Sequence, residues 1–398
     1  METHECIVIG GGVSGLVGAS RLARAGRSVL LLEAESRLGG CARTWRPRPD
    51  FWLELGAHTA YNSYGPLLEA LADRGRLGEL LTREKLGYRF IDHQGATSSP
   101  MTRLGFVEAA LHLPFGLGRP KAGRSVAEWF GGLLGKGNYR RLLAPAFAAV
   151  LSQPADAFPA EWLFRRKPRM QEAPRKFTFS GGLQGLLEAL AEDAPFAVRP
   201  GAAVTALTGG RDGYEIRVGD ERLACRQLFL AVPVDAAAAL LAQVHPQAAR
   251  ILAGFPMASS EALGVLVPAD RVGLQPVAGL IGDEDDFWSV VSRDILPHES
   301  LRGFTFHFRP GRLDRQGKLD RAAAALGVAP GDFLDVAECL NRLPAPGVVH
   351  PPRVAELDAL LAGEPLALAG NYLNGLSLGD CAERAAREAD RLLNLKES

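Results

Sequence analysis

Residues 7–44, IVIGGGVSGLVGASRLARAGRSVLLLEAESRLGGCART, decide the fold of this chain. An apolar run over residues 7–9 leads into a glycine-rich turn, then a helical segment, then a second apolar run that ends at Glu33. A strand, a helix and a second strand in this order form a βαβ unit. The stretch therefore predicts a Rossmann-like α/β domain built to hold a dinucleotide.

The turn after the first apolar run carries G-x-G-x-x-G at Gly10, Gly12 and Gly15. Gly10 permits the tight turn, Gly12 lets the backbone approach a pyrophosphate, and Gly15 lets helix and strand pack closely. The helix N-terminus, with Val13 and Ser14, presents unpaired N–H groups and the positive end of a dipole to phosphates. We expect these five residues to bind the pyrophosphate of the dinucleotide.

An acidic residue ends the second apolar run at Glu33 and is followed by Ala34. A carboxylate about 20 residues after the glycine motif hydrogen-bonds a ribose hydroxyl. The same carboxylate repels a 2′-phosphate, which disfavours NADP. We therefore expect Glu33 and Ala34 to contact the ribose.

A second glycine pair follows the acid at Gly39 and Gly40, and Arg43 and Thr44 come next. This pair lets the chain double back over the pyrophosphate, whose charge Arg37 or Arg43 could meet. The extension favours FAD over NAD as the cofactor.

These motifs resemble the opening of the FAD-dependent amine oxidase and protoporphyrinogen oxidase superfamily, whose pattern is G-x-G-x-x-G, E-x5-G-G and R-[ST]. Three later stretches are similar to family motifs: residues 125–151 (SVAEWFGGLLGKGNYRRLLAPAFAAVL), 177–190 (FTFSGGLQGLLEAL) and 366–381 (LALAGNYLNGLSLGDC). The resemblance covers almost the whole chain. The last stretch is closest to protoporphyrinogen oxidase-like proteins.

The resemblance implies further cofactor contacts, each carried over from a family motif onto the matching residue. They are Gly56, Ala57 and His58 in the turn that faces the isoalloxazine, and Val204 as the valine that clasps the adenine. The A-[TV]-P segment supplies Ala231 and Pro233, and the closing motif supplies Gly370 and Asn371. His58 is a candidate catalytic base, a pocket-lining residue or a hydrogen-bonded histidine in a turn. The family has no fixed acid or base at this place, so the catalytic residues stay unassigned.

The fold class expected is α/β, a glutathione reductase-type FAD-binding domain interwoven with an α+β substrate domain of helices and an antiparallel sheet. The FAD-binding domain takes residues 1–65, 177–245 and 358–398, and the substrate domain takes residues 66–176 and 246–357. Hydrophobic periodicity predicts helices over residues 66–81, 106–112, 126–134, 139–151, 160–164 and 318–326. Strands are predicted over residues 197–199, 203–207, 214–218, 222–225, 228–232, 264–267, 277–281, 288–291 and 303–308.

Composition narrows the classes of partner. The chain has 398 residues, 45 Lys and Arg against 45 Asp and Glu, and so no electrostatic footprint for nucleic acid. Its five cysteines form no C-x-x-C, so we expect neither a metal site nor a disulfide framework. No apolar run reaches the roughly 18 residues that span a bilayer. The chain enters its first strand at once, so no signal peptide and a cytoplasmic location are expected.

The expected activity is removal of hydride from a C–H bond of a large, largely apolar substrate, with a porphyrinogen as first choice. The basic residues between 165 and 175 either meet substrate carboxylates or form a solvated or membrane-facing patch, and the patch is favoured. The weakly charged segment 104–117 is core, a substrate entrance or an interfacial anchor. Peripheral membrane contact therefore stays an open alternative, and the oligomeric state is not assigned.

Two other functions stay open. One is an isoprenoid or carotenoid desaturase-like or amine oxidase-like flavoenzyme of secondary metabolism. Amine oxidases of the family carry paired aromatic residues around the substrate amine, and residues 373–378 supply none after Tyr372. The other is a non-catalytic binding protein on the same fold, which the intact glycines and Glu33 disfavour.

Overall fold

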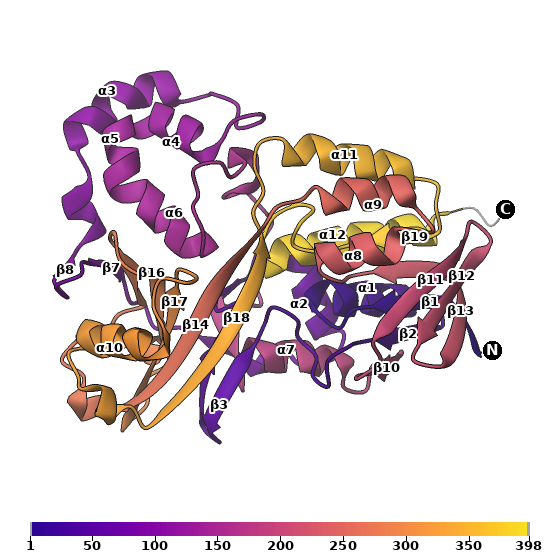
Figure 1. Cartoon of the computed structure of the whole chain (residues 1–398), viewed down its shortest axis with the longest axis horizontal. Coiled ribbons are helices and arrows are strands. Elements are labelled where there is room, and N and C mark those ends of the chain that lie inside the picture. The colour runs from indigo at the N-terminus through magenta and orange to yellow at the C-terminus, as the bar shows by residue number, and fades with distance from the viewer. Residues whose placement is uncertain (1, 396–398) are drawn as a thin grey trace.

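The computed structural model describes residues 2–395, which form two large sheets with helices around them (Figure 1). The first sheet lies at the end that holds both termini. Its order is β10-β2-β1-β13-β12-β11, and β19 also pairs with β13. The strands are β1 (Glu2–Ile9), β2 (Val29–Leu32), β10 (Ala197–Arg199), β11 (Val204–Gly210), β12 (Gly213–Val218), β13 (Glu221–Leu230) and β19 (Leu366–Leu368).

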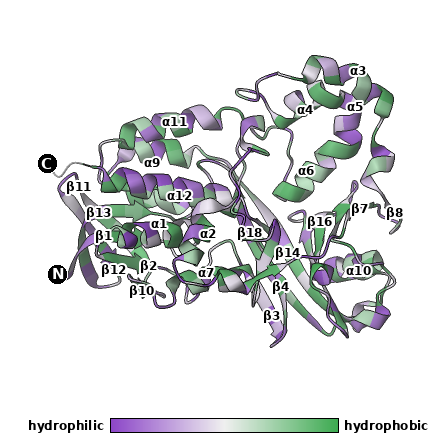
Figure 2. Ribbon diagram, turned by 180° about the vertical axis from the view of Figure 1, so that it is seen from behind, coloured by the Kyte–Doolittle hydropathy of each residue, from purple (hydrophilic) through white to green (hydrophobic). Residues whose placement is uncertain are grey.

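Both faces of the sheet are buried at its centre, over the last four residues of β1 and all of β2. Successive side chains of a strand point to opposite faces. In β1, Cys6 and Val8 belong to one core, whereas Ile7 and Ile9 belong to the other. Accordingly, the centre of this sheet carries hydrophobic stretches in Figure 2, such as the second half of β1, as expected for parallel strands covered on both sides.

Two groups of helices cover the two faces. The first core contains α1 (Val13–Arg24), α2 (Gly65–Ala72), α7 (Gly182–Ala191) and α12 (Leu378–Leu393). The second contains α8 (Val234–Leu241), α9 (Pro246–Ala253) and α11 (His350–Leu361). The glycine turn between β1 and α1 thus lies at the carboxyl end of a central parallel strand, where doubly wound sheets bind ligands.

The second sheet has the order β18-β14-β17-β16-β15-β7-β8. Its neighbours are antiparallel except β7 and β15, which are parallel. The strands are β7 (Tyr88–Ile91), β8 (Thr97–Ser98), β14 (Met257–Pro268), β15 (Gly279–Gly282), β16 (Phe287–Ser292), β17 (Leu301–Phe308) and β18 (Asp335–Pro344).

Alternation along β17 separates the two faces of the second sheet. Phe304, Phe306 and Phe308 pack in the core that includes α10 (Arg315–Leu326). Thr305 and His307 point to the opposite face and are nonetheless buried. A buried polar face on this sheet is where the candidate site lies.

A helical lobe stands at the far end of the molecule from the first sheet (Figure 1). It contains α3 (Phe106–Gly116), α4 (Val126–Leu134), α5 (Lys136–Asn138) and α6 (Ala144–Leu151). A capping box between Ser125 and Glu128 fixes the start of α4. Two small sheets contain the other strands. One pairs β3 (Thr44–Arg48) with β4 (Phe51–Glu54), and the other has the order β5 (Ala60–Tyr61), β9 (Lys176–Phe179) and β6 (Leu80–Thr82).

Short helical turns connect these elements. They are η1 (Leu77–Glu79), η2 (Pro100–Arg103), η3 (Tyr139–Leu143), η4 (Ala160–Trp162), η5 (Ala269–Arg271), η6 (Arg293–Ile295) and η7 (Pro330–Asp332). None of the helices within residues 2–395 combines the length and the apolar character that a membrane span requires.

The predicted helix over residues 126–134 and the predicted strand over 197–199 are confirmed. The predicted helix over 66–81 ends instead at Ala72, because Leu80–Thr82 pairs with β9 as a strand. The strands predicted over 222–225 and 228–232 are one strand, β13. Its first half pairs antiparallel with β12, and its second half pairs parallel with β19.

Segment 66–176 is not only helical. Tyr88–Ile91 forms β7 and joins the second sheet, which lies mostly in residues 257–344. Gly65–Ala72 forms α2 and packs against α1 and α12. The division of the chain into two interwoven domains stays a prediction.

Candidate functional site

The glycine turn between β1 and α1 can be built only from glycine at two positions. Gly10 has φ +108°, and a Cβ there would lie 2.3 Å from the carbonyl oxygen of Ala231. A Cβ on Gly15 would lie 1.8 Å from the carbonyl oxygen of Gly10. The turn therefore brings the A-V-P segment after β13 against the start of the glycine motif, as Ala231 N–H also donates to the carbonyl of Ile9.

The N-terminus of α1 lacks a cap of its own. Gly12 is the N-cap residue without a side-chain hydrogen bond, and the first turn, with Val13 and Ser14, holds no acidic residue. The first N–H groups of α1 therefore have no capping side chain and no carboxylate within their own helical turn. This arrangement attracts phosphate.

The second glycine pair lies against this turn. Gly39 forms a bridge with Gly12, and its N–H donates to the carbonyl of Gly11 at 2.9 Å. A Cβ on Gly40 would lie 3.2 Å from the Cα of Gly12. Two glycine segments thus form one narrow backbone cradle in front of α1.

Glu33 is held rigidly at the end of β2. Its carboxylate accepts the N–H of Gly11 at 2.6 Å and the N–H of Glu35 at 2.8 Å. Ala34 beside it is exposed. Ala202 N–H donates to the carbonyl of Glu33 at 2.7 Å, so Val204, two residues later, lies near this corner. A carboxylate has about four acceptor sites, and those that remain can bind ribose hydroxyls.

The arginines of the motif share one acidic partner. Arg37 lies 2.9 Å from the carboxylate of Glu35 and also donates to the carbonyl of Gly40 at 3.1 Å. Arg43 lies 3.3 Å from the same carboxylate. Both guanidinium groups therefore lie on the Glu35 carboxylate, and that of Arg37 also contacts the loop of the second glycine pair.

Thr44 joins the second glycine loop to α7. Its hydroxyl donates to Glu54 at 2.7 Å, and it exchanges backbone and side-chain hydrogen bonds with Gln184 at 3.1 Å. Glu54 also accepts the N–H of Leu183 at 2.7 Å, which caps the start of α7. Burial raises the pKa of Glu54 to about 7.

The flavin-facing turn of the family motif meets the closing motif around Cys41. A Cβ on Gly56 would lie 2.1 Å from the carbonyl oxygen of Cys41, and Ala57 N–H donates to that carbonyl at 3.0 Å. The amide of Asn371 lies 3.9 Å from the Cys41 sulfur, in the loop after Gly370. Segments more than 300 residues apart in the sequence therefore meet here.

Pro233 stands slightly apart from this meeting point. It is the N-cap residue of α8, two residues after Ala231. The predicted cofactor residues thus lie along one stretch of the structure, with Glu33 at one end and Asn371 at the other. Their individual contacts to a cofactor stay predictions.

A small pocket lies beside the turn that carries His58. Strand β4, the end of β16, η6 and β17 contribute its walls, which include Trp52, Glu54, His58, Thr178, Arg293 and Thr305. The Nδ1 of His58 lies 3.2 Å from the carbonyl oxygen of Gly56. Burial lowers the pKa of His58 to about 4, so the ring is neutral and a weak base near pH 7. This favours a lining role for His58 over general-base catalysis.

A second histidine lies against His58. The ring centroids of His58 and His307 are 5.7 Å apart, tilted by 34°. Burial, with His58 adding to the effect, lowers the pKa of His307 to about 3. Two neutral imidazoles therefore stand side by side at the polar face of the second sheet.

Polar atoms on this face lack protein partners. Within the described residues, both ring nitrogens of His307 and the hydroxyls of Thr305 and Ser289 are buried without a hydrogen bond. Ser289 faces His307 across the β16–β17 pair. An unsatisfied buried polar group costs about 1–3 kcal/mol, so such a cluster indicates a site for a hydrogen-bonding ligand or for water.

Sequence reasoning identified His58 and missed Arg293, Thr305 and His307. The predicted strand over residues 303–308 implied that Thr305 and His307 share one face. Nothing local indicated that this face would oppose the turn at His58, because that contact joins residues about 250 positions apart.

The basic run at residues 165–175 is partly used inside the protein. Arg165 and Lys167 lie 2.5 and 2.8 Å from Asp380 at the start of α12, and Lys167 also pairs with Glu383 at 2.9 Å. Burial alone would raise the pKa of Asp380, but Lys167 and its hydrogen-bond partners hold it below its ordinary value. These two cations therefore fasten the closing motif, and Arg166 and Arg169 remain exposed.

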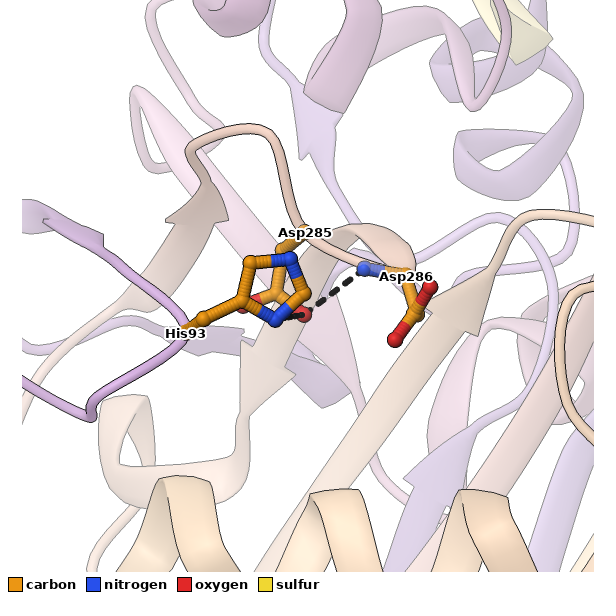
Figure 3. Close-up of side chains that lie close together, drawn as sticks. All are labelled: His93, Asp285 and Asp286. Carbon is orange, nitrogen blue, oxygen red and sulfur yellow. Dashed lines mark hydrogen bonds and ion pairs between the residues drawn. The ribbon is translucent and has the colours of Figure 1, made fainter.

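One cluster within residues 2–395 brings three metal-ligating side chains together: His93, Asp285 and Asp286 (Figure 3). Asp285 is already bound by Arg321, whose Nε lies 2.9 Å away, and it accepts the N–H of Asp286 at 2.7 Å. The cluster joins the β15–β16 loop to α10. Its central carboxylate is neutralised by arginine, so we assign it a structural role.

Comparison with protein families and curated proteins gives one family match and two partial relatives. Residues 13–269 match the family model described as flavin containing amine oxidoreductase. (S)-6-hydroxynicotine oxidase from Paenarthrobacter nicotinovorans is 44% identical over 73 residues, 18% of this chain and 17% of that protein. A 15-cis-phytoene desaturase from Narcissus pseudonarcissus is 34% identical over 85 residues, 21% of this chain and 14% of that protein. The matches thus span less than a fifth of these relatives' length.

Comparison with solved structures extends over the whole chain. The crystal structure of an Exiguobacterium protein, provisionally described as a protoporphyrinogen oxidase, has a TM-score of 0.74, and 98% of each chain is covered. Sequence identity is 18%, so this similarity shows the fold.

Proposed function

Because this chain belongs to the family of flavin containing amine oxidoreductases, we propose that it is an FAD-dependent oxidoreductase that removes hydride from a C–H bond of a large, largely apolar substrate. FAD is the cofactor of this family. When bound, it supplies the two-electron acceptor for such a reaction. The substrate proposed first is a porphyrinogen.

The glycine cradle supports FAD as the group that this region holds. The uncapped N-terminus of α1 after Gly12 suits a pyrophosphate, and the carboxylate of Glu33 suits a ribose. Gly56 packs directly against the backbone of Cys41, which brings the turn of Gly56 and the loops of Cys41 and Asn371 together. The chain's own part is to bind, to orient and to exclude water.

We base the choice of substrate on the charged residues in the pocket lining. Glu54, its acidic lining residue, is occupied by Thr44 and Leu183 and has a raised pKa of about 7. No free carboxylate in the lining therefore stands ready to hold an ammonium group. The closing motif with Asn371 supports a porphyrinogen over an amine or a polyene.

Flavin reduction by candidate substrates tests this proposal. The purified holoprotein is mixed without oxygen with protoporphyrinogen, phytoene or a panel of primary amines, and the visible flavin absorbance is followed. We expect protoporphyrinogen to bleach the flavin at least about 100-fold faster than any amine, as a site matched to one set of polar groups discriminates. Faster bleaching by an amine or by phytoene would move the assignment to that class. A purified protein without flavin would favour a binding protein instead.

We also propose that α3 contacts a membrane surface. Four large apolar residues of α3 and its C-cap residue are between 63 and 76% exposed: Phe106, Val107, Leu111, Phe115 and Leu117. Residues 101–150 hold seven basic residues and two acidic ones, Glu108 and Glu128. Both acids accept backbone N–H groups inside the lobe. An exposed apolar helix in a basic lobe suits an anionic lipid surface.

Vesicle flotation tests the membrane contact. We expect the protein to float with phosphatidylserine-containing vesicles and far less with pure phosphatidylcholine, and the double variant Phe106→Ser, Phe115→Ser to stay at the bottom of the gradient. Leu340→Ser, which changes a residue 62% exposed on β18, is the matched control and should float. Wild-type protein that never floats, or a double variant that floats fully, contradicts the proposal.

A further inference from the structure

Arg293 is a half-buried cation in the wall of the pocket beside His58. It lies on η6, directly after β16. Its guanidinium carbon lies 4.4 Å from the ring centroid of Trp52 and 5.3 Å from that of Phe51. Burial lowers its pKa to about 10, so the group is still charged near pH 7. The two aromatic rings hold this charge by cation–π attraction.

No carboxylate within residues 2–395 forms an ion pair with Arg293. The adjacent Asp294 is bound through both oxygens by Arg302, at 2.8 and 2.5 Å. Glu54 is bound by the Thr44 hydroxyl and the Leu183 N–H and acts on Arg293 only from a longer distance. The pocket therefore contains a positive charge that no carboxylate of the described residues contacts directly.

The hydrogen bonds of Arg293 indicate the shape of the missing anion. Its Nη1 donates to the carbonyl of Leu296, whereas its buried Nε has no partner in the described part of the chain. Nε and Nη2 form the edge of a guanidinium that binds both oxygens of a carboxylate. A single cation matches the single charge of a carboxylate, and pairing offsets the cost of burying the cation.

We propose that Arg293 is a carboxylate subsite, which binds an acidic group of an otherwise apolar substrate and so orients that substrate beside His58. The inference rests on the proposed function, because it assigns the anion to the substrate. Ile295 and Leu296 supply apolar walls to the same pocket, and Thr305 supplies a neutral hydroxyl. Arg293 is a binding residue in this scheme, and the oxidation itself requires nothing further from it.

Binding of octanoate and octanamide to the holoprotein, measured by calorimetry, tests the subsite. A charge-assisted hydrogen bond is stronger than one between neutral groups, so we expect octanoate to bind at least about 10-fold more tightly than the uncharged amide. Arg293→Gln should abolish this preference. Arg293→Lys should keep part of it, because lysine retains the charge but lacks the two-pronged geometry.

Arg309→Gln is the matched control. Arg309 also lies over a tryptophan, 4.0 Å from the ring centroid of Trp288, and its buried Nε has no partner among the described residues. It does not line the pocket, so its variant should keep the preference for octanoate. The FAD content and circular dichroism of each variant verify folding, and Arg293→Lys decides if Arg293→Gln does not fold.

The outcomes separate this inference from the proposed function. An octanoate preference that is absent in the wild type, survives in Arg293→Gln or disappears equally in Arg309→Gln overturns the subsite. Flavin reduction by protoporphyrinogen is measured without octanoate, so it can succeed when the subsite fails. A preference that depends on Arg293, together with a flavin that no substrate reduces, would reject the function and keep the anion site.

Discussion

Replacing Gly12 by alanine is expected to weaken FAD binding by about 100-fold, equivalent to roughly 3 kcal/mol, while the apoprotein keeps its stability. A Cβ on Gly12 would meet only the Cα of Gly40, at 3.7 Å, which is an ordinary contact. The methyl group would instead occupy the cradle in front of α1, where the pyrophosphate has to approach the N–H groups. Titration of apoprotein with FAD, followed by flavin fluorescence, measures the affinity, and thermal melting measures the stability.

Two further glycine variants serve as controls for Gly12→Ala. Gly78→Ala adds a Cβ that meets nothing within 4 Å, so it should change neither quantity. Gly15→Ala places a Cβ 1.8 Å from the carbonyl oxygen of Gly10, so it should lower both the affinity and the melting temperature. If Gly12→Ala binds FAD like the wild type, or melts as early as Gly15→Ala, the cradle is not the phosphate site.

Lowering the pH from 7 to 4.5 is expected to destabilise the fold by about 3 kcal/mol through His307 alone. His307 is 2% exposed, and burial lowers its pKa from 6.5 to about 3. The unfolded chain takes up a proton below pH 6.5, whereas the folded chain stays neutral there. Stability is therefore fully present above pH 6.5 and is lost as the pH falls towards 3. His58, with its pKa lowered to about 4, adds a loss of the same sign.

Urea unfolding at pH 7 and pH 4.5 measures this loss. His307→Phe keeps a ring of similar size and removes the titrating group, so its stability should fall less than that of the wild type over this interval. His112→Phe, which changes an exposed histidine on α3, is the matched control for the substitution itself. An equal loss in the wild type and in His307→Phe would show that His307 is not held neutral.

The signals that determine the cofactor cradle are local. Gly10 and Gly15 are required by backbone geometry within one turn, and Glu33 bonds back to Gly11 only 22 residues away. Strand and helix periods are also local, which is why α4 and β10 follow their predicted bounds. The similarity of residues 366–381 to the family's closing motif indicated in advance that the loop of Asn371 belongs to this region.

Strand pairing lies beyond such local signals. The sequence predicted two strands where β13 is one, because the change from antiparallel to parallel neighbours is a property of its partners β12 and β19. It predicted no strand between residues 82 and 105, although Tyr88–Ile91 forms β7 as a parallel neighbour of β15. Short strands of this kind form only when a distant edge is available to pair with them.

The sequence by itself therefore determined the fold class, the flavin and the cradle that suits it, since each depends on residues close along the chain. Only the tertiary structure decided the chemistry of the pocket. His58 and His307 become neutral because two distant elements bury them together. Arg293 is left without a directly contacting carboxylate because Arg302 binds the neighbouring Asp294. Burial and competition among charges depend on all the surrounding elements, and no stretch of sequence contains them.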